Sequence, residues 1–161
     1  MSGGAKKLLH AAAGTAASGD PVYVEDVFST YLYTGNNSVS TQTFNTGLDM
    51  AGEGGMIWFK SRTNSQVARI LDTERGTLAS LIPSSQAANS NLGADGLTYL
   101  SDGFSIGWTG GDLASAQDYA SYSFRKQTAF FDVLTYSGSN STQAISHNLG
   151  CVPGMIIVKR T

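Results

Sequence analysis

The chain has little of what several common classes of protein depend on. Cys151 is its single cysteine, which excludes an intrachain disulfide and a thiolate metal cage. Charged residues make up 14% of the sequence, well below the ~25% typical of soluble domains. The net charge is −2, and no cluster of basic residues is longer than two. A nucleic-acid partner is therefore not expected, because such partners need a basic surface.

Long apolar runs and histidines are also scarce. No run approaches the ~18 apolar residues that a membrane-spanning helix needs, so no membrane span is predicted. His10 lies in an N-terminal tail, and we interpret His147 as a solvated turn residue in preference to a general base. The carboxylates are scattered, without a declared pair of the kind that glycosidases use. The sequence predicts no enzyme, no cofactor and no metal site.

Residues 1–24 form a segment rich in glycine, alanine and serine. Leu8 and Leu9 are its sizeable apolar side chains, followed by His10. A segment this short is not a stable helix alone, so we expect it to order against a partner and to anchor the protein. An alternative is a cleaved signal peptide, which Lys6, Lys7 and the apolar stretch after them imitate weakly.

From Glu25 onward, short runs of alternating apolar and polar residues are separated by glycine-rich turns. Such runs every 8–12 residues predict an all-β fold, an antiparallel β-sandwich, over residues 25–128. The predicted strands cover residues 28–34, 41–44, 56–60, 67–72, 97–100, 104–107 and 119–126. Asp102-Gly103 is expected at the tip of a hairpin. The predicted core contains Phe28, Leu32, Ile57, Phe59, Ile70, Phe104 and Phe124, and Trp58 is interpreted as a core residue as well.

The sequence begins to repeat itself after about a hundred residues, a period that indicates tandem domains and not a solenoid. The first copy contains Tyr33-Thr34-Gly35-Asn36-Asn37-Ser38, Thr41-Gln42-Thr43-Phe44, Leu48 and Gly55-Met56-Ile57. The second contains Tyr136-Ser137-Gly138-Ser139-Asn140-Ser141, Thr142-Gln143-Ala144-Ile145, Leu149 and Gly154-Met155-Ile156. We expect residues 129–161 to start a second sandwich. The apolar strand at 155–159 would lack partners, so we also expect the 161 residues to be the N-terminal portion of a longer chain.

Candidate contact residues lie in two loops, residues 83–98 and 107–118. Asn89, Asn91, Trp108 and Asp112 could contact a glycan or a protein partner, because flat rings and amides suit sugar sites. Trp108 could equally pack beneath its own loop. The densest charged cluster, Asp72-Thr73-Glu74-Arg75-Gly76, is either a cation or sugar site or, as we prefer, a turn in which Arg75 pairs with a carboxylate.

Several segments together resemble a known family. They are Asp26-Val27-Phe28-Ser29-Thr30-Tyr31-Leu32-Tyr33-Thr34-Gly35-Asn36, Gly55-Met56-Ile57-Trp58-Phe59-Lys60-Ser61-Arg62, Leu71-Asp72-Thr73-Glu74-Arg75-Gly76, Ser101-Asp102-Gly103-Phe104, Phe124-Arg125-Lys126, Phe130-Phe131-Asp132-Val133 and His147-Asn148-Leu149-Gly150-Cys151-Val152-Pro153-Gly154-Met155-Ile156. These segments resemble the tandem domains in virion proteins of marine tailed phages, especially phages of cyanobacteria. Such domains are related to the concanavalin-A-like jelly-roll sandwich. The likeness marks a fold, and it carries over no catalytic or ligand residue.

The resemblance implies a structural protein of the virion. It implies the N-terminal part of a tail fibre of a short-tailed phage, a homotrimer that docks on the adaptor or nozzle proteins of the tail barrel. From the residues of the N-terminal segment, we expect Leu8, Leu9 and His10 to make the docking contact. The distal part of such a fibre meets the host surface, where a glycan could be the ligand. The alternative is a lectin-like carbohydrate-binding module on a virion or cell surface.

Overall fold

In a computed structural model, the described part of the protein is built from antiparallel sheets and one short 3₁₀ helix. The structure describes residues 21–37, 40–86, 90–91, 96–107, 113 and 115–160. The elements are η1 (Val24–Asp26), β1 (Phe28–Thr34), β2 (Gln42–Asn45), β3 (Gly55–Ser61), β4 (Arg69–Asp72), β5 (Ala79–Ser80), β6 (Ser90–Asn91), β7 (Leu97–Leu100), β8 (Gly103–Ile106) and β9 (Asp118–Arg125). The predicted N-terminal anchoring segment lies almost wholly outside these residues.

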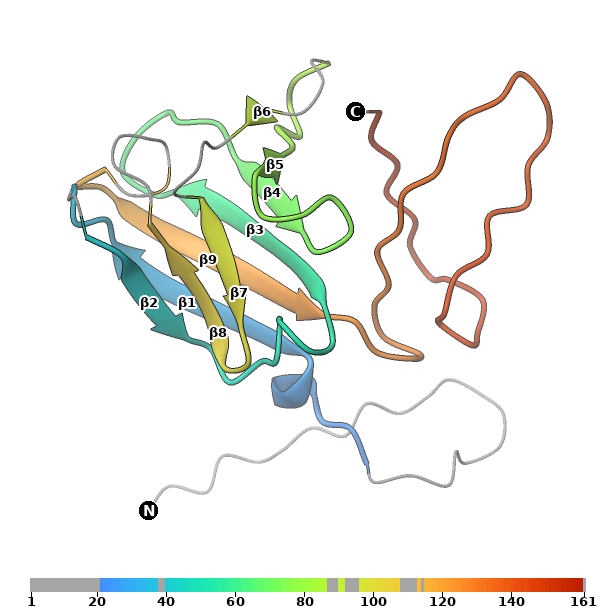
Figure 1. The fold of residues 1–161 in the computed structure, drawn as a ribbon, viewed down its shortest axis with the longest axis horizontal. Coiled ribbons are helices and arrows are strands. Elements are labelled where there is room, and N and C mark those ends of the chain that lie inside the picture. The colour runs from blue at the N-terminus through green and yellow to red at the C-terminus, as the bar shows by residue number, and fades with distance from the viewer. Residues whose placement is uncertain are drawn as a thin grey trace.

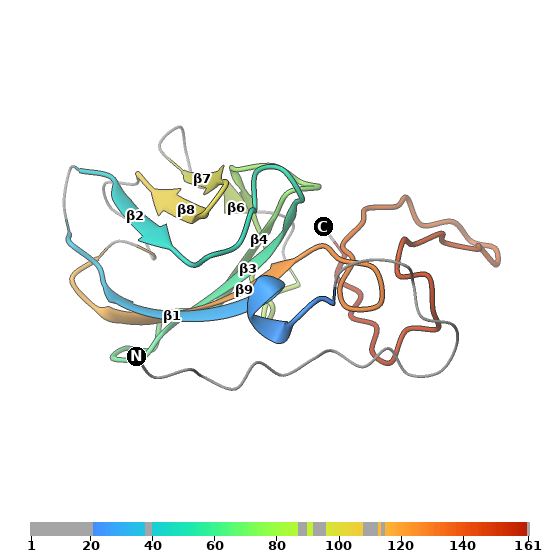
Figure 2. The same ribbon diagram turned by 90° about the horizontal axis from the view of Figure 1, so that it is seen from below.

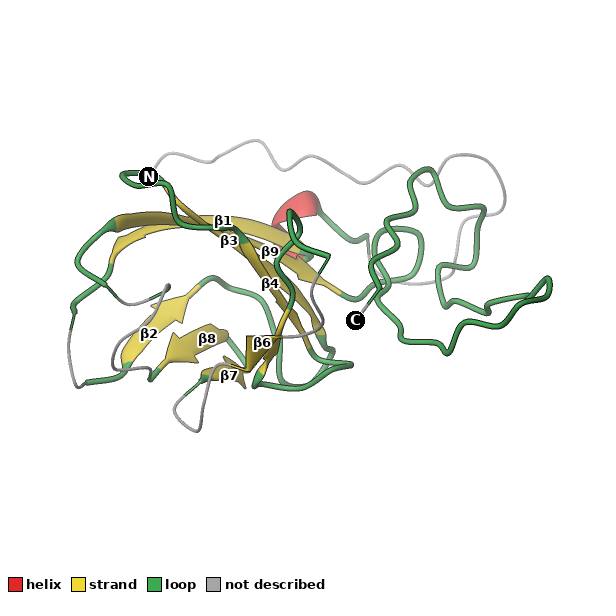
Figure 3. Cartoon of the chain, turned by 90° about the horizontal axis from the view of Figure 1, so that it is seen from above, coloured by secondary structure: helices red, strands yellow, loops and turns green. Residues whose placement is uncertain are grey.

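Two sheets pack face to face as a sandwich. The larger sheet has the strand order β1-β9-β3-β4 and the smaller one β2-β8-β7, and β5 and β6 form a separate pair. All pairings are antiparallel. Figure 2 shows the smaller sheet lying over the larger one, and Figure 3 shows the same layers from the other side. The predicted antiparallel β-sandwich is therefore confirmed, and the finer jelly-roll type stays a prediction.

The core fills the space between the two sheets. Its buried side chains are Tyr33, Phe44, Leu48, Met50, Ile57, Phe59, Leu71, Leu97, Phe104, Ile106, Leu113 and Tyr119. Aromatic rings connect the layers: Phe59 meets Phe104 edge-on with ring centroids 5.4 Å apart, and Tyr33 lies 4.5 Å from Phe44. The predictions of Ile57, Phe59 and Phe104 as core residues are confirmed, because each is buried.

Strand β1 faces the other way from the prediction. Tyr33 is buried, whereas Leu32 is 61% exposed and Phe28 is only half-buried. Both faces of this strand carry apolar residues, so alternation could not identify the inner one. Tyr33 takes the inner position because its ring stacks on Tyr119 and its hydroxyl donates to the carbonyl of Leu113 at 3.1 Å.

The prediction for β9 is wrong for a related reason. Ser121 and Ser123 are fully buried, and Phe124 is half-buried on the opposite face. In the register of β9 with β3, Ser121 lies opposite Phe59 and Ser123 opposite Ile57. Small side chains are needed there because the neighbouring large ones fill the interior.

The outer face of the larger sheet also holds Trp58 and Ile70. Both are half-buried and alternate with the buried residues of β3 and β4. Their assignment to the core is therefore wrong. Tyr122, which is exposed, lies opposite Trp58 on the same face.

Residues 133–160 follow the sandwich without forming a strand or helix. Figure 1 shows this segment, coloured orange to red, as a looped trace beside one end of the sheets. Its apolar residues Val152, Met155, Ile156, Ile157 and Val158 are all exposed. The second sandwich, and the division between residues 128 and 129, stay predictions.

Candidate functional site

Most of the residues predicted to make contacts are not among those that the structure describes. Leu8, Leu9, His10, Asn89, Trp108 and Asp112 fall outside the described residues. Asn91 lies in β6, opposite Ala79. Two hollows among the described residues are better defined candidates, and sequence reasoning identified neither.

The charged cluster after β4 proves to be a turn held by an ion pair. Arg75 Nε donates to Asp72 Oδ2 at 2.7 Å, and the backbone N–H of Arg75 donates to Asp72 Oδ1 at 2.9 Å. The same guanidinium donates to the carbonyl of Ala79 at 3.2 Å. Glu74 instead accepts a hydrogen bond from Lys126 at 2.7 Å. The interpretation as a turn is confirmed, because the Asp72 carboxylate is paired with Arg75 and the Glu74 carboxylate with Lys126.

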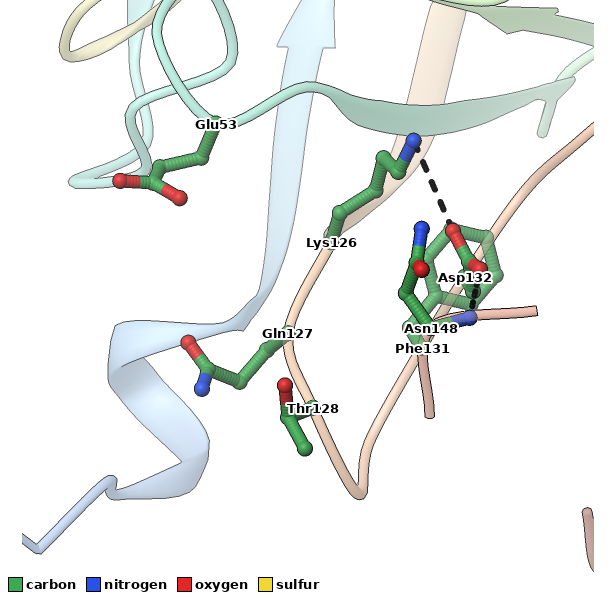
Figure 4. A pocket seen from close by; sticks show the side chains of 7 residues that line it. All are labelled: Glu53, Lys126, Gln127, Thr128, Phe131, Asp132 and Asn148. Carbon is green, nitrogen blue, oxygen red and sulfur yellow. Dashed lines mark hydrogen bonds and ion pairs between the residues drawn. The ribbon is translucent and has the colours of Figure 1, made fainter. Parts of the chain in front are cut away.

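The first hollow lies where the sandwich meets the segment after β9 (Figure 4). This junction pocket has a volume of about 200 Å³ and is lined by Glu53, Lys126, Gln127, Thr128, Phe131, Asp132 and Asn148. The Lys126 ammonium also lies 3.5 Å from Asp132. The pKa of Lys126 is raised, chiefly by its hydrogen bond to Glu74, although partial burial opposes the shift. The lysine therefore stays charged and paired, which suits a structural tie more than a nucleophile.

Asp132 links the second copy of the repeat to the sandwich through its ion pair with Lys126. Its nearly buried carboxylate accepts hydrogen bonds from the backbone N–H of Val133 at 2.9 Å and of Asn148 at 2.8 Å. The N–H of Ala129 donates to the carbonyl of Leu149, also at 2.8 Å. The most specific string of the resemblance, which begins at His147, is thus hydrogen-bonded to the residues that directly follow the sandwich.

His147 is exposed in this docked turn, as predicted. Its Nδ1 accepts a hydrogen bond from the backbone N–H of Leu149 at 3.3 Å. A ring nitrogen that caps a local turn is a structural feature, in line with our interpretation of this residue. The carboxylate of Asp132 was the important group nearby, and sequence reasoning missed it. Its position just before the repeated segment was the one available signal.

The second hollow lies on the outer face of the smaller sheet. We call it the hydroxyl-lined hollow; it has a volume of about 280 Å³ and is lined by Thr41, Thr77, Leu78, Gly96, Leu97, Thr98, Ser105 and Gly107. None of these lining residues is charged. Gly107 is the first residue of the predicted loop 107–118, and Gly96 lies within the predicted loop 83–98. The hollow therefore borders both loops in which contacts were predicted.

Neither hollow has the composition of a metal site. Among the described residues, no three His, Cys, Asp or Glu side chains are grouped so that they could hold a metal ion. Within the same part of the chain, no helix is long and apolar enough to span a membrane.

The chain matches a known protein family. Residues 24–161 match the family described as a domain of unknown function, DUF7483. The match includes both the sandwich and the segment docked on it. No curated protein and no solved structure matches the chain.

Proposed function

We propose that this chain, which belongs to the DUF7483 family, is a structural protein of a virion. In this proposal it is the N-terminal part of a phage tail fibre, which docks on the tail and carries distal host-binding domains. The observation that carries the proposal is the fastened junction between the two copies of the repeat. The sequence resemblance to virion proteins of marine tailed phages supports the same conclusion.

The junction suits a protein that must hold successive modules at a set angle. Consecutive domains move relative to one another unless their interface restrains them. Here Asp132 joins both sides of the junction, because it accepts a hydrogen bond from Asn148 and lies beside Lys126 at the end of β9. Lys126 in turn reaches Glu74 in the turn after β4. A restrained junction of this kind fits an appendage that transmits position from a tail to a distal tip.

The proposed partners follow from the same function. The protein would form a homotrimer and dock on the adaptor or nozzle proteins of the tail barrel. Leu8, Leu9 and His10 would make the docking contact, since a flexible segment with a few apolar side chains can order on a partner surface. The proposed role is structural and includes no enzymatic activity and no cofactor.

The test is incorporation of the protein into particles. Immuno-electron microscopy with an antibody against residues 25–128 should label the tail of purified phage, and labelling of the capsid alone would contradict the proposal. Deleting residues 1–20 should leave the sandwich folded but abolish labelling, as should the double change Leu8→Asp and Leu9→Asp. The Asp20→Asn change is a matched control that should label normally.

Mass spectrometry of the same particles tests the anchoring segment separately. A mature chain that retains residues 1–20 is expected. A chain that begins near Gly19 would show that the segment is removed, and docking through Leu8 and Leu9 would have to be abandoned.

A second candidate function is carbohydrate binding by a lectin-like module. The hydroxyl-lined hollow favours it, because uncharged hydroxyl groups and an apolar wall suit the polar edge and apolar face of a sugar ring. Binding of the full chain to a glycan array, with retention on defined glycans, would support this function. An array without any retained glycan would count against it.

A further inference from the structure

We propose that the hydroxyl-lined hollow binds a single neutral sugar ring. The proposal rests on the carbohydrate-binding function named above and gives that function a place and a ligand class. It uses only the described residues of the hollow.

The register of β7 and β8 explains why a hollow exists on this face. Thr98 pairs with Ser105. Two residues away on each strand, Gly96 and Gly107 are also opposite each other, and the N–H of Gly107 donates to the carbonyl of Gly96 at 3.3 Å. Side chains two residues apart point to the same face of a sheet, so the two glycines lie beside the two hydroxyl residues. Because glycine has no side chain, the sheet surface is depressed at this point.

Residues that carry hydroxyl groups line the depression. They are Thr41, Thr77, Thr98 and Ser105, and within the described part of the chain none of their four hydroxyls makes a hydrogen bond. Each hydroxyl can both donate and accept, which matches the hydroxyls of a sugar. Leu78 supplies an apolar wall for the C–H face of a ring.

The size of the hollow and the lack of charge among its lining residues restrict the class of sugar that it can bind. Its volume of about 280 Å³ is just below the ~300–1,000 Å³ of pockets that hold drug-sized ligands, so it suits one ring and not an oligosaccharide. Among the described residues no cationic side chain lines it, and an anionic sugar would lose its hydration there without a partner from this set. A neutral hexose or N-acetylhexosamine fits both limits.

The experiment is an NMR titration of the ¹⁵N-labelled full chain with glucose, galactose, mannose and N-acetylglucosamine. At least one sugar should shift the amide signals of Gly96, Thr98, Ser105 and Gly107 saturably, with a dissociation constant in the millimolar range (~1 mM corresponds to weak single-ring binding). The double change Thr98→Val and Ser105→Ala, which removes two hydroxyls at nearly constant shape, should weaken binding at least about fivefold.

Thr43→Val is the matched control. Thr43 pairs with Ser105 from the other side and is exposed, but it does not line the hollow, so binding should be unchanged. The dispersion of the spectrum reports in each case whether the variant is folded. Sugar-induced shifts confined to other amides would overturn this site and leave carbohydrate binding standing. No saturable shift with any of the four sugars, or wild-type affinity in the folded double variant, would also overturn the proposed site.

Discussion

The two copies of the repeat carry matching apolar residues but differ in what covers them. Ile57 and Phe59 in β3 are 0% and 1% exposed, whereas their counterparts Ile156 and Val158 are 75% and 66% exposed. Tyr33 and Tyr136 differ in the same direction. Burial of these residues is therefore a property of the strands around them and not of the segment itself.

The partners of β3 account for the difference. It is paired with β9 on one side and with β4 on the other, and Phe59 meets Phe104 of the smaller sheet. Among the described residues, nothing pairs as a strand with residues 154–159. A strand-like sequence that pairs with no other strand gains no strand structure, because its backbone groups and apolar face are solvated by water instead.

Truncation of equivalent positions in the two copies should change the stability of the protein by very different amounts. Phe59→Ala should lower the free energy of unfolding by about 3–5 kcal/mol, because it leaves a cavity in the core. Val158→Ala should change it by less than about 0.5 kcal/mol, because Val158 is exposed. Urea denaturation of the two variants checks both values. A comparable loss in Val158→Ala would show that the second copy is packed after all.

The second prediction concerns β4, the strand that pairs with one side of β3. Arg75→Ala should cost about 3 kcal/mol or more, since it leaves the Asp72 carboxylate buried without its cation. Glu74→Ala, which removes the more exposed pair and leaves Lys126 beside Asp132, should cost no more than about 1 kcal/mol. Thermal unfolding of both variants provides the measurement, and equal costs would contradict the distinction between the two pairs.

The third prediction uses pH to compare the tyrosines of the two copies. Burial raises the pKa of Tyr33 above its usual value, with a smaller contribution from Tyr119, and burial likewise raises the pKa of Tyr99. The folded state then keeps these protons where the unfolded chain loses them, at a pH of about 10. This stability is fully present below about pH 10 and is lost as the pH rises further.

The measurement is the melting temperature between pH 8 and pH 11.5. Tyr33→Phe should make the alkaline decline shallower, after a loss at neutral pH of about 1 kcal/mol for the hydrogen bond to Leu113. Tyr136→Phe is the control and should leave the profile unchanged, because that side chain is exposed. Identical slopes in wild type and Tyr33→Phe would contradict the prediction.

The smallest effect is expected on the outer face of the larger sheet. Leu32→Thr should change stability by less than about 0.5 kcal/mol, because Leu32 is exposed and threonine suits a strand. Tyr33→Thr, one position along the same strand, should be clearly destabilising in the same urea experiment. A larger destabilisation by Leu32→Thr than by Tyr33→Thr would instead support the orientation of β1 that the sequence predicted.

The candidate sites were predictable only in part. The role of Asp72 and Arg75 in a turn followed from their spacing, since a carboxylate at a strand end can accept both a backbone and a guanidinium bond three residues on. Asp132 was missed because its partner Asn148 lies sixteen residues away. The hydroxyl-lined hollow was missed because its residues come from separate strands and a loop, and a sequence does not show which glycines become neighbours.

The sequence by itself determined the all-β character, the position of most strands, and the β7–β8 hairpin with Asp102-Gly103 at its tip. These features depend on local alternation and on turn residues; Gly103, for example, has a φ of +140° that other residues rarely adopt. The tertiary structure alone decided which face of β1 and β9 is buried and where the two copies are fastened. An alternating strand offers two faces, and the choice between them is made by the side chains it meets across the sheet and across the core.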